Sequence, residues 1–172
     1  MKGLTDHRER LEIVGRLLDR LVEVLRGKIG EDLISVVLYG SYARAESTPQ
    51  SDVDVLIIAR RFSPSSLERQ GFFAKIAGEA ESPFMPAFQA AGWFPYLSAI
   101  LKTPEEAGRT SRIYFDMVEE ARIVFDRDGF FRGVLQRVKK RLEELGARKV
   151  RVGRMWYWDL KPDYQPGEIF EI

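Results

Sequence analysis

Hydrophobic residues recur along the chain with two different spacings. Over residues 6–26 they fall every three or four positions, which predicts an amphipathic helix ended by Gly27 and Gly30. The same spacing returns after the turn at residues 126–129 and continues to Gly146, where a second long helix is expected to end. Both helices would turn one apolar side toward a core.

Four short apolar segments have the length and composition of buried strands. They are rich in β-branched residues and too short for helices; they are residues 33–39, 52–59, 96–101 and 121–125. Residues 149–158 predict a further strand or hairpin. Because strands and helices are interspersed, the expected fold is α/β (α+β), with a small mixed sheet flanked by helices.

Local start signals place two more helices. Residues 63–66, Ser-Pro-Ser-Ser, favour a helix start. Residues 103–106, Thr-Pro-Glu-Glu, combine an N-cap, a first-turn proline and a capping-box glutamate, and the helix they begin is expected to reach about Glu120. Prolines and a glycine predict irregular structure over residues 83–95, and the tail from residue 159 is expected to be extended and ordered only by docking.

The length and composition fit one domain. With 172 residues and 45% hydrophobic content, we expect a single domain over residues 1–172, with a core over about 5–126 and a C-terminal helix and extended tail over about 127–172. The absence of cysteine excludes disulfides, thiolate zinc sites and cysteine nucleophiles. No apolar run is long enough to span a bilayer, so a soluble cytoplasmic protein without a membrane partner is expected.

Positive charge gathers near the C-terminus although the formal net charge is only +1. This basic segment is either a solvated helix face or a contact surface for phosphate or RNA; it contains Arg137, Lys139, Lys140, Arg141, Arg148, Lys149, Arg151 and Arg154. The adjoining aromatic residues 156–158, Trp-Tyr-Trp, either form a base-stacking platform or close a hydrophobic edge. The sequence leaves both alternatives open.

A Gly-Ser pair follows directly after the first predicted strand. Gly40 allows the backbone to approach a phosphate closely, and the free N–H groups at the start of the short helix expected there favour an anion. Ser41 adds a hydroxyl donor. The pair therefore predicts a binding site for the phosphates of a nucleotide.

Two aspartates stand at the mouth of the second predicted strand. Asp52 and Asp54 are two positions apart, so their side chains point to the same face of a strand and can share divalent cations. Mg²⁺ is the cation expected, because it completes its octahedral shell with water and substrate phosphate. In a two-metal arrangement such ions activate an attacking hydroxyl and stabilise a pyrophosphate leaving group.

Taken together, Gly40-Ser41, Ala43-Arg44 and Ser51-Asp52-Val53-Asp54 resemble the minimal (MNT-type) members of the nucleotidyltransferase superfamily related to DNA polymerase beta. The resemblance is closest over residues 30–60. It implies a nucleotidyltransferase-like fold and transfer of a nucleoside monophosphate from a nucleoside triphosphate to an acceptor hydroxyl, with Mg²⁺.

The resemblance also implies roles for individual residues. Asp52 and Asp54 would be the catalytic residues and metal ligands, and Gly40, Ser41, Arg44 and Ser51 would bind the nucleotide. For Arg44, a phosphate contact and pairing with a nearby carboxylate remain equal alternatives. Ser51 can also serve to fix the turn before the second strand.

The sequence departs from the superfamily at the third catalytic carboxylate, which the strand over residues 96–101 would normally carry. That segment contains no carboxylate, and Ser98 could coordinate a metal only weakly. Loss of a metal ligand and general base lowers the rate by orders of magnitude. The alternative function that the resemblance implies is a catalytically weak or inactive nucleotide-binding partner, similar to an antitoxin, of a HEPN-type ribonuclease. Its docking strip would be the tail, through Tyr164, Ile169 and Phe170, unless the tail wraps the protein's own sheet.

Overall fold

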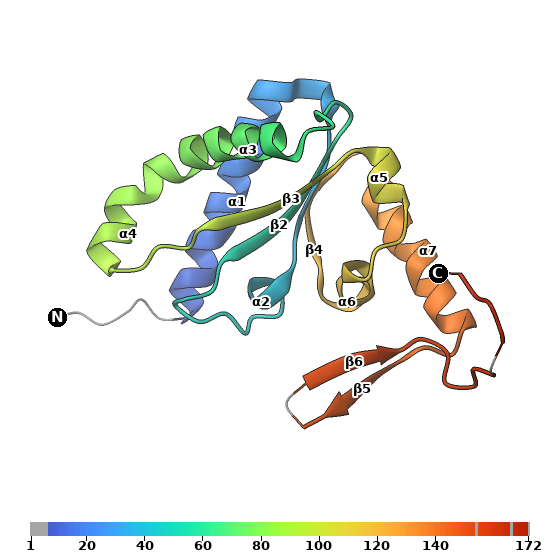
Figure 1. Ribbon diagram of the computed structural model, residues 1–172. Coiled ribbons are helices and arrows are strands. Elements are labelled where there is room, and N and C mark those ends of the chain that lie inside the picture. The colour runs from blue at the N-terminus through green and yellow to red at the C-terminus, as the bar shows by residue number, and fades with distance from the viewer. Residues whose placement is uncertain (1–6, 154, 166, 172) are drawn as a thin grey trace.

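A four-stranded mixed sheet forms the centre of the molecule (Figure 1). The computed structural model describes residues 7–153, 155–165 and 167–171. The strands are β1 (Leu33–Leu38), β2 (Val53–Ala59), β3 (Leu97–Lys102) and β4 (Arg122–Asp126), in the order β3-β2-β1-β4. β2 and β3 are parallel, whereas β1 is antiparallel to β2 and β4. The predicted mixed sheet is confirmed, with each strand beginning and ending within one residue of its expected segment.

Helices cover both faces of the sheet, which makes it the middle of three layers (Figure 1). α1 and α3 pack on one face, and α5, α6 and α7 pack on the other. The helices are α1 (His7–Ile29), α2 (Gly40–Ala43), α3 (Ser66–Glu81), α4 (Met85–Ala91), α5 (Pro104–Gly108), α6 (Ile113–Glu120) and α7 (Phe130–Glu144). Short 3-10 turns lie at Gly30–Asp32, Ser82–Phe84 and Arg127–Gly129. Among the described residues, no helix is both long and apolar enough to cross a lipid bilayer.

The alternation of side chains along β2 determines which of the two helical layers lies on the same side of the sheet as the two aspartates. Val55 and Ile57 are buried against α1 and α3, whereas Leu56 and Ile58 are buried against the layer of α5, α6 and α7. Successive side chains of a strand point to opposite faces, so Asp54 shares the face of Leu56. The carboxylate therefore points toward the side of the sheet that carries α6.

A second, two-stranded sheet stands apart from the first, below α6 and α7 in Figure 1. It is a hairpin of β5 (Arg148–Val152) and β6 (Met155–Asp159), which confirms the hairpin alternative for this segment. The described residues that follow it form no strand, and the main-chain oxygen of Glu171 accepts a hydrogen bond from Arg141 Nε on α7 at 2.8 Å. The tail therefore returns to α7 and does not wrap the main sheet; Pro166 and Ile172 lie outside the described residues.

Two predictions about the helices were wrong. Residues 103–120 form two helices, because the chain after Gly108 turns to an extended conformation at Arg109 (φ −83°, ψ 133°). Residues 83–95, expected to be irregular, contain α4. Pro86 lies in the first turn of that helix, where its missing N–H has no helical acceptor to lose.

The predicted helix starts are confirmed. The Ser65 side chain accepts a hydrogen bond from the main-chain N–H of Glu68, and Thr103 and Glu106 form a complete capping box. The first helix passes through Gly27, which was expected to end it, and stops at Ile29 before Gly30, whose φ is +51°. Its predicted start at Asp6 lies outside the described residues.

Two side chains of α3 contact the outer edge of β3. Glu81 Oε1 accepts a hydrogen bond from the main-chain N–H of Leu97 at 3.2 Å, and Arg69 Nη1 donates to the main-chain oxygen of Leu101 at 3.0 Å. Arg69 also forms a bidentate pair with Glu106, at 2.7 and 2.9 Å. These contacts hold β3 against α3 and α5.

Candidate active site

The two aspartates lie where β2 begins, beside the turn that leaves β1. Asp54 is half-buried and Asp52 is exposed. The main-chain N–H of Tyr39 donates to the main-chain oxygen of Asp54 at 3.0 Å, which fixes the residue just before Gly40 against the second aspartate. The structure therefore brings the Gly-Ser turn and the Asp-x-Asp pair into direct contact.

Gly40 is the point of closest approach between these two motifs. Its φ is +72°, a conformation that side chains other than glycine adopt at a cost. A Cβ atom at this position would lie 2.4 Å from Asp54 Oδ2. Glycine is therefore required both by the backbone conformation and by the carboxylate, and its lack of a side chain keeps the space in front of Asp54 open.

The electrostatics of the site favour an added positive charge. Burial, and secondly the negative charge of Asp52, raise the pKa of Asp54, whereas Arg44 acts in the opposite direction. Burial, and secondly the charge of Asp54, raise the pKa of Tyr39 to about 12. Two adjacent carboxylates on one strand face, beside an uncrowded glycine, form a donor set that fits a divalent cation bound together with a phosphate.

The remaining predicted nucleotide-binding residues surround this pair. Ser41 is the second residue of α2, and its main-chain oxygen accepts a hydrogen bond from the N–H of Glu46 at 2.9 Å. Ser51 closes the turn before β2, since its Oγ accepts from the N–H of Thr48 at 2.9 Å. The turn-fixing interpretation of Ser51 therefore agrees with its contacts, and Ser41 remains the candidate for a phosphate contact.

Arg44 is held by two carboxylates. Its Nε contacts Glu46 at 2.8 Å, and its Nη1 contacts Glu120 on α6 at 3.1 Å. The hydrogen bond that Arg44 donates to Glu46 is the main cause that raises the pKa of Arg44. Pairing with a carboxylate, one of the two alternatives considered from the sequence, is thus what the structure shows.

The expected position of a third carboxylate is occupied by a serine. In the parallel pairing of β2 with β3, Asp54 lies opposite Ser98, which is exposed. Within residues 7–153, 155–165 and 167–171, no three histidine, cysteine, aspartate or glutamate side chains are grouped so that they could hold a metal ion. Later carboxylates such as Asp116 and Asp159 are engaged with Lys149 and Arg148.

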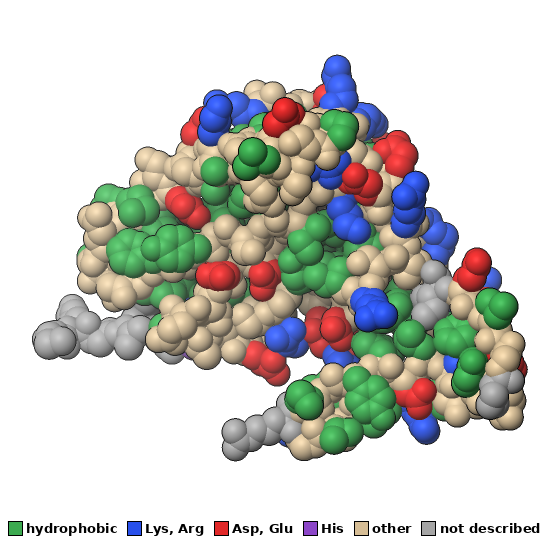
Figure 2. Space-filling model, viewed as in Figure 1, with side chains coloured by type: hydrophobic (Ala, Val, Ile, Leu, Met, Phe, Trp, Pro, Cys, Tyr) green, Lys and Arg blue, Asp and Glu red, His purple; other side chains and the backbone are tan. Residues whose placement is uncertain are grey.

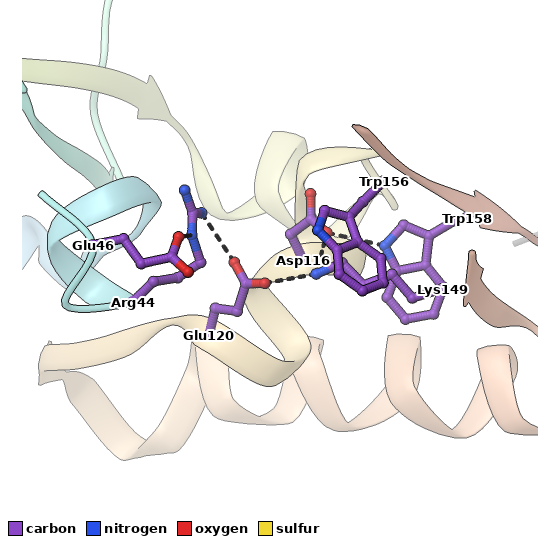
Figure 3. A pocket seen from close by; sticks show the side chains of 7 residues that line it. All are labelled: Arg44, Glu46, Asp116, Glu120, Lys149, Trp156 and Trp158. Carbon is purple, nitrogen blue, oxygen red and sulfur yellow. Dashed lines mark hydrogen bonds and ion pairs between the residues drawn. The ribbon is translucent and has the colours of Figure 1, made fainter. Parts of the chain in front are cut away.

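A cavity of about 460 Å³ opens on the far side of Arg44, between α6 and the hairpin (Figure 3). It is lined by Arg44, Glu46, Asp116, Glu120, Lys149, Trp156 and Trp158. Figure 2 shows the corresponding hollow between the main body and the hairpin, with acidic and basic side chains together at its edge. We call this cavity the hairpin pocket.

An ion-pair chain crosses the hairpin pocket. Lys149 Nζ contacts Glu120 at 2.6 Å and Asp116 at 3.2 Å, and the second oxygen of Glu120 contacts Arg44 (Figure 3). Sequence analysis missed Asp116 and Glu120. Nothing in their local sequence marks them, because Glu120 meets Arg44 across 76 positions of the chain.

A comparison with protein-family models identifies the family of this chain. The model of the nucleotidyltransferase domain matches residues 18–152. The chain belongs to the nucleotidyltransferase domain family. The matched region of this nucleotidyltransferase includes both motifs, α7 and β5, so the resemblance seen over residues 30–60 extends over most of the chain.

Known proteins similar to this nucleotidyltransferase include one archaeal relative. A protein of Methanocaldococcus jannaschii, whose name gives it provisionally as a protein adenylyltransferase, is 28% identical over 130 residues, which cover 74% of this chain and 82% of the relative.

Two solved structures are also similar. One, of a toxin–antitoxin with AMP-PNP, has 15% identity and a TM-score of 0.45 and covers 75% of this chain and 92% of its own. The other, described provisionally as a nucleotidyltransferase from Sulfolobus solfataricus, has 17% identity and a TM-score of 0.41 and covers 74% of this chain and 95% of its own.

Proposed function

We propose that this nucleotidyltransferase moves AMP from ATP to a hydroxyl group of a protein acceptor. The observation that carries the proposal is the contact between Gly40 and the Asp52–Asp54 pair, which joins an open backbone turn to two carboxylates on one strand face. The family supplies the reaction type. The name of the M. jannaschii relative supports ATP as donor and a protein as acceptor.

Each residue of the site has a separate role in the proposed in-line displacement. Asp52 and Asp54 would hold Mg²⁺, which neutralises charge on the triphosphate and stabilises the pyrophosphate that leaves. Gly40 leaves room for the phosphates, and Ser41 donates a hydrogen bond to them. The acceptor oxygen bonds to the α-phosphorus, the bond from that phosphorus to pyrophosphate breaks, and the hydroxyl proton passes to water.

Ser98 favours a second candidate function. With serine opposite Asp54, the described residues offer two carboxylates for a metal ion instead of three, and this favours slow transfer or binding without transfer. The second candidate is therefore a nucleotide-binding partner of another protein, for which a HEPN-type ribonuclease remains the proposed class. The two functions differ in whether label from ATP becomes covalently attached to protein.

Calorimetry with Mg²⁺ and ATP, followed by incubation of α-labelled ATP with a cell lysate, tests both. The variants are Asp52→Asn and Asp54→Asn, and the matched control is Asp128→Asn, which removes an exposed charge at a turn outside the site. We expect Mg²⁺-dependent binding that both site variants lose and the control keeps. Covalent attachment of the ATP label to protein supports transfer, whereas ATP binding without labelled protein supports the second candidate. ATP binding that is unchanged in Asp52→Asn and Asp54→Asn contradicts the proposed site.

A further inference from the structure

One face of the hairpin alternates cations with indole rings. In the pairing of β5 with β6, Lys149 lies opposite Trp158 and Arg151 lies opposite Trp156, so these four side chains share a face. Lys149 Nζ is 6.0 Å from the ring centre of Trp158, and the Arg151 guanidinium carbon is 5.4 Å from that of Trp156. Trp158 packs on Phe115 of α6, whereas Trp156 is 56% exposed.

The exposure of Trp156 corrects one interpretation of the aromatic segment. A residue that closes a hydrophobic edge loses its contact with solvent, and of the two tryptophans only Trp158 does so to a large extent. The indole of Trp156 instead lines the hairpin pocket (Figure 3). An exposed planar ring at the wall of a cavity is the arrangement that stacks planar ligands.

The hairpin pocket adjoins the candidate triphosphate site. Arg44 lines the pocket, and its main-chain N–H donates to the main-chain oxygen of Gly40 at 3.2 Å, so one turn of α2 joins the two sites. Asp54 and α6 lie on the same side of the sheet. A ligand with phosphates at Gly40 can therefore extend past Arg44 toward Trp156.

The charges around the pocket indicate which part of a ligand fits there. Three carboxylates, Glu46, Asp116 and Glu120, face two cations, Arg44 and Lys149, and both cations are already engaged with these carboxylates. The unmatched carboxylate charge of the lining is balanced by Arg151 on Trp156, so an additional phosphodiester backbone would gain no net attraction. A planar group with amine donors would instead find an aromatic wall and hydrogen-bond acceptors.

We propose that the hairpin pocket holds the nucleobase of the bound triphosphate, stacked on Trp156. The exocyclic amine donates to Asp116, whose contacts with Trp158 and Lys149 both use Oδ1 and leave Oδ2 as an acceptor. Adenine, cytosine and guanine carry such an amine and uracil does not, so the pocket discriminates against UTP. The assignment rests on the proposed function, which places the phosphates at Gly40, Asp52 and Asp54.

Calorimetry with Mg²⁺-ATP, Mg²⁺-UTP, Mg²⁺-tripolyphosphate and adenosine separates the base from the phosphates. Trp156→Ala is compared with Tyr157→Ala, because Tyr157 is equally exposed, at 53%, but lies on the opposite hairpin face. We expect Trp156→Ala to weaken ATP and adenosine binding about tenfold or more and to leave tripolyphosphate binding unchanged. Tyr157→Ala should bind all four like the wild type, and Asp116→Ala should reduce the preference for ATP over UTP.

The outcomes distinguish this proposal from the proposed function. Adenosine binding that survives Asp52→Asn but not Trp156→Ala supports the nucleobase pocket even if the metal site fails. If Trp156→Ala and Tyr157→Ala bind ATP with equal affinity, the nucleobase pocket is contradicted. If ATP binding in that case still depends on Asp52, the proposed transferase site remains supported. A short single-stranded RNA that binds Trp156 more tightly than adenosine and ATP do overturns it as well, in favour of an RNA surface.

Discussion

Ser98 on β3 lies opposite Asp54 on β2, and both side chains point to the side of the sheet that carries the candidate active site. Parallel register places their Cβ atoms close to one another. The strand and the direction needed for a third carboxylate are thus present, and only the side chain is different. The absence of a third carboxylate that was noted in the sequence therefore corresponds to one position, Ser98.

Replacement of this serine should raise activity. Ser98→Asp places a carboxylate beside Asp54, where it can share a metal ion and accept a proton, so we expect stronger Mg²⁺ dependence and transfer faster by on the order of tenfold. Label transfer from α-labelled ATP measures the rate. Ser98→Asn, of nearly the same shape without the charge, should not accelerate transfer; equal rates for the two variants would show that the charge does not matter.

Gly40→Ala should weaken nucleotide binding without unfolding the protein. The new Cβ would meet Asp54 Oδ2 at 2.4 Å and displace the carboxylate, so we expect Mg²⁺-ATP affinity to fall at least about tenfold. The matched control is Gly92→Ala, which has a similar φ of +62° but no atom within 4 Å of the added Cβ. Both variants should lose roughly 1 kcal/mol of stability from backbone strain, and only Gly40→Ala should lose ATP affinity.

Glu120→Gln should loosen the hairpin. The Glu120 side chain is only 18% exposed and joins Lys149 of β5 to Arg44, so removal of its charge weakens both contacts. We expect amide hydrogen exchange over residues 148–159 to become faster by on the order of tenfold. Glu119→Gln is the control, since Glu119 contacts Lys149 only at 3.9 Å; an equal effect of both variants would contradict a specific anchor at Glu120.

The pair between Arg69 and Glu106 should make stability depend on acid pH. The hydrogen bonds from Arg69 and from the Thr103 main chain lower the pKa of Glu106 to about 2. A lowered folded-state pKa stabilises the fold above the ordinary glutamate pKa, and this contribution is lost as the pH falls from about 5 to about 2. Because 42% of the Glu106 side chain is exposed, we expect only roughly 1 kcal/mol.

Urea unfolding of Glu106→Gln at pH 7 and near pH 2 measures this contribution. The variant should be less stable than the wild type at pH 7 and nearly equal to it near pH 2. Glu105→Gln, a change to the neighbouring exposed glutamate, should have a smaller effect. If the difference in free energy of unfolding between Glu106→Gln and the wild type does not change with pH, the contribution does not arise from the charge of Glu106.

Local chemistry explains why much of the fold was predictable. The strands around Val36 and Ile57 are mostly apolar, and Thr103 and Glu106 cap a helix through contacts only three positions apart. The candidate metal pair was predictable for the same reason, since alternation along one strand places Asp52 and Asp54 on one face.

The other half of the site depends on contacts between distant segments. Arg44 meets Glu120 across 76 positions, and Asp116 meets Trp158 across 42. The break between α5 and α6 lies at Gly108 and Arg109. The strong helix-start signal of the preceding residues led to the prediction of one continuous helix through this point. Spacing along the chain contains no information about such pairs, so the hairpin pocket became visible only in the fold.

The hydrogen bonds from α3 to the outer edge of β3 determine how another protein can reach the site. Glu81 accepts a hydrogen bond from the N–H of Leu97, and Arg69 donates one to the main-chain oxygen of Leu101. An added strand would have to pair with these two main-chain groups. β-Strand addition along this edge is therefore blocked at both ends. Under the proposed function, we therefore expect an acceptor protein to present a loop or a helix end across the tips of the strands, so that a single protruding side chain enters without the two backbones pairing.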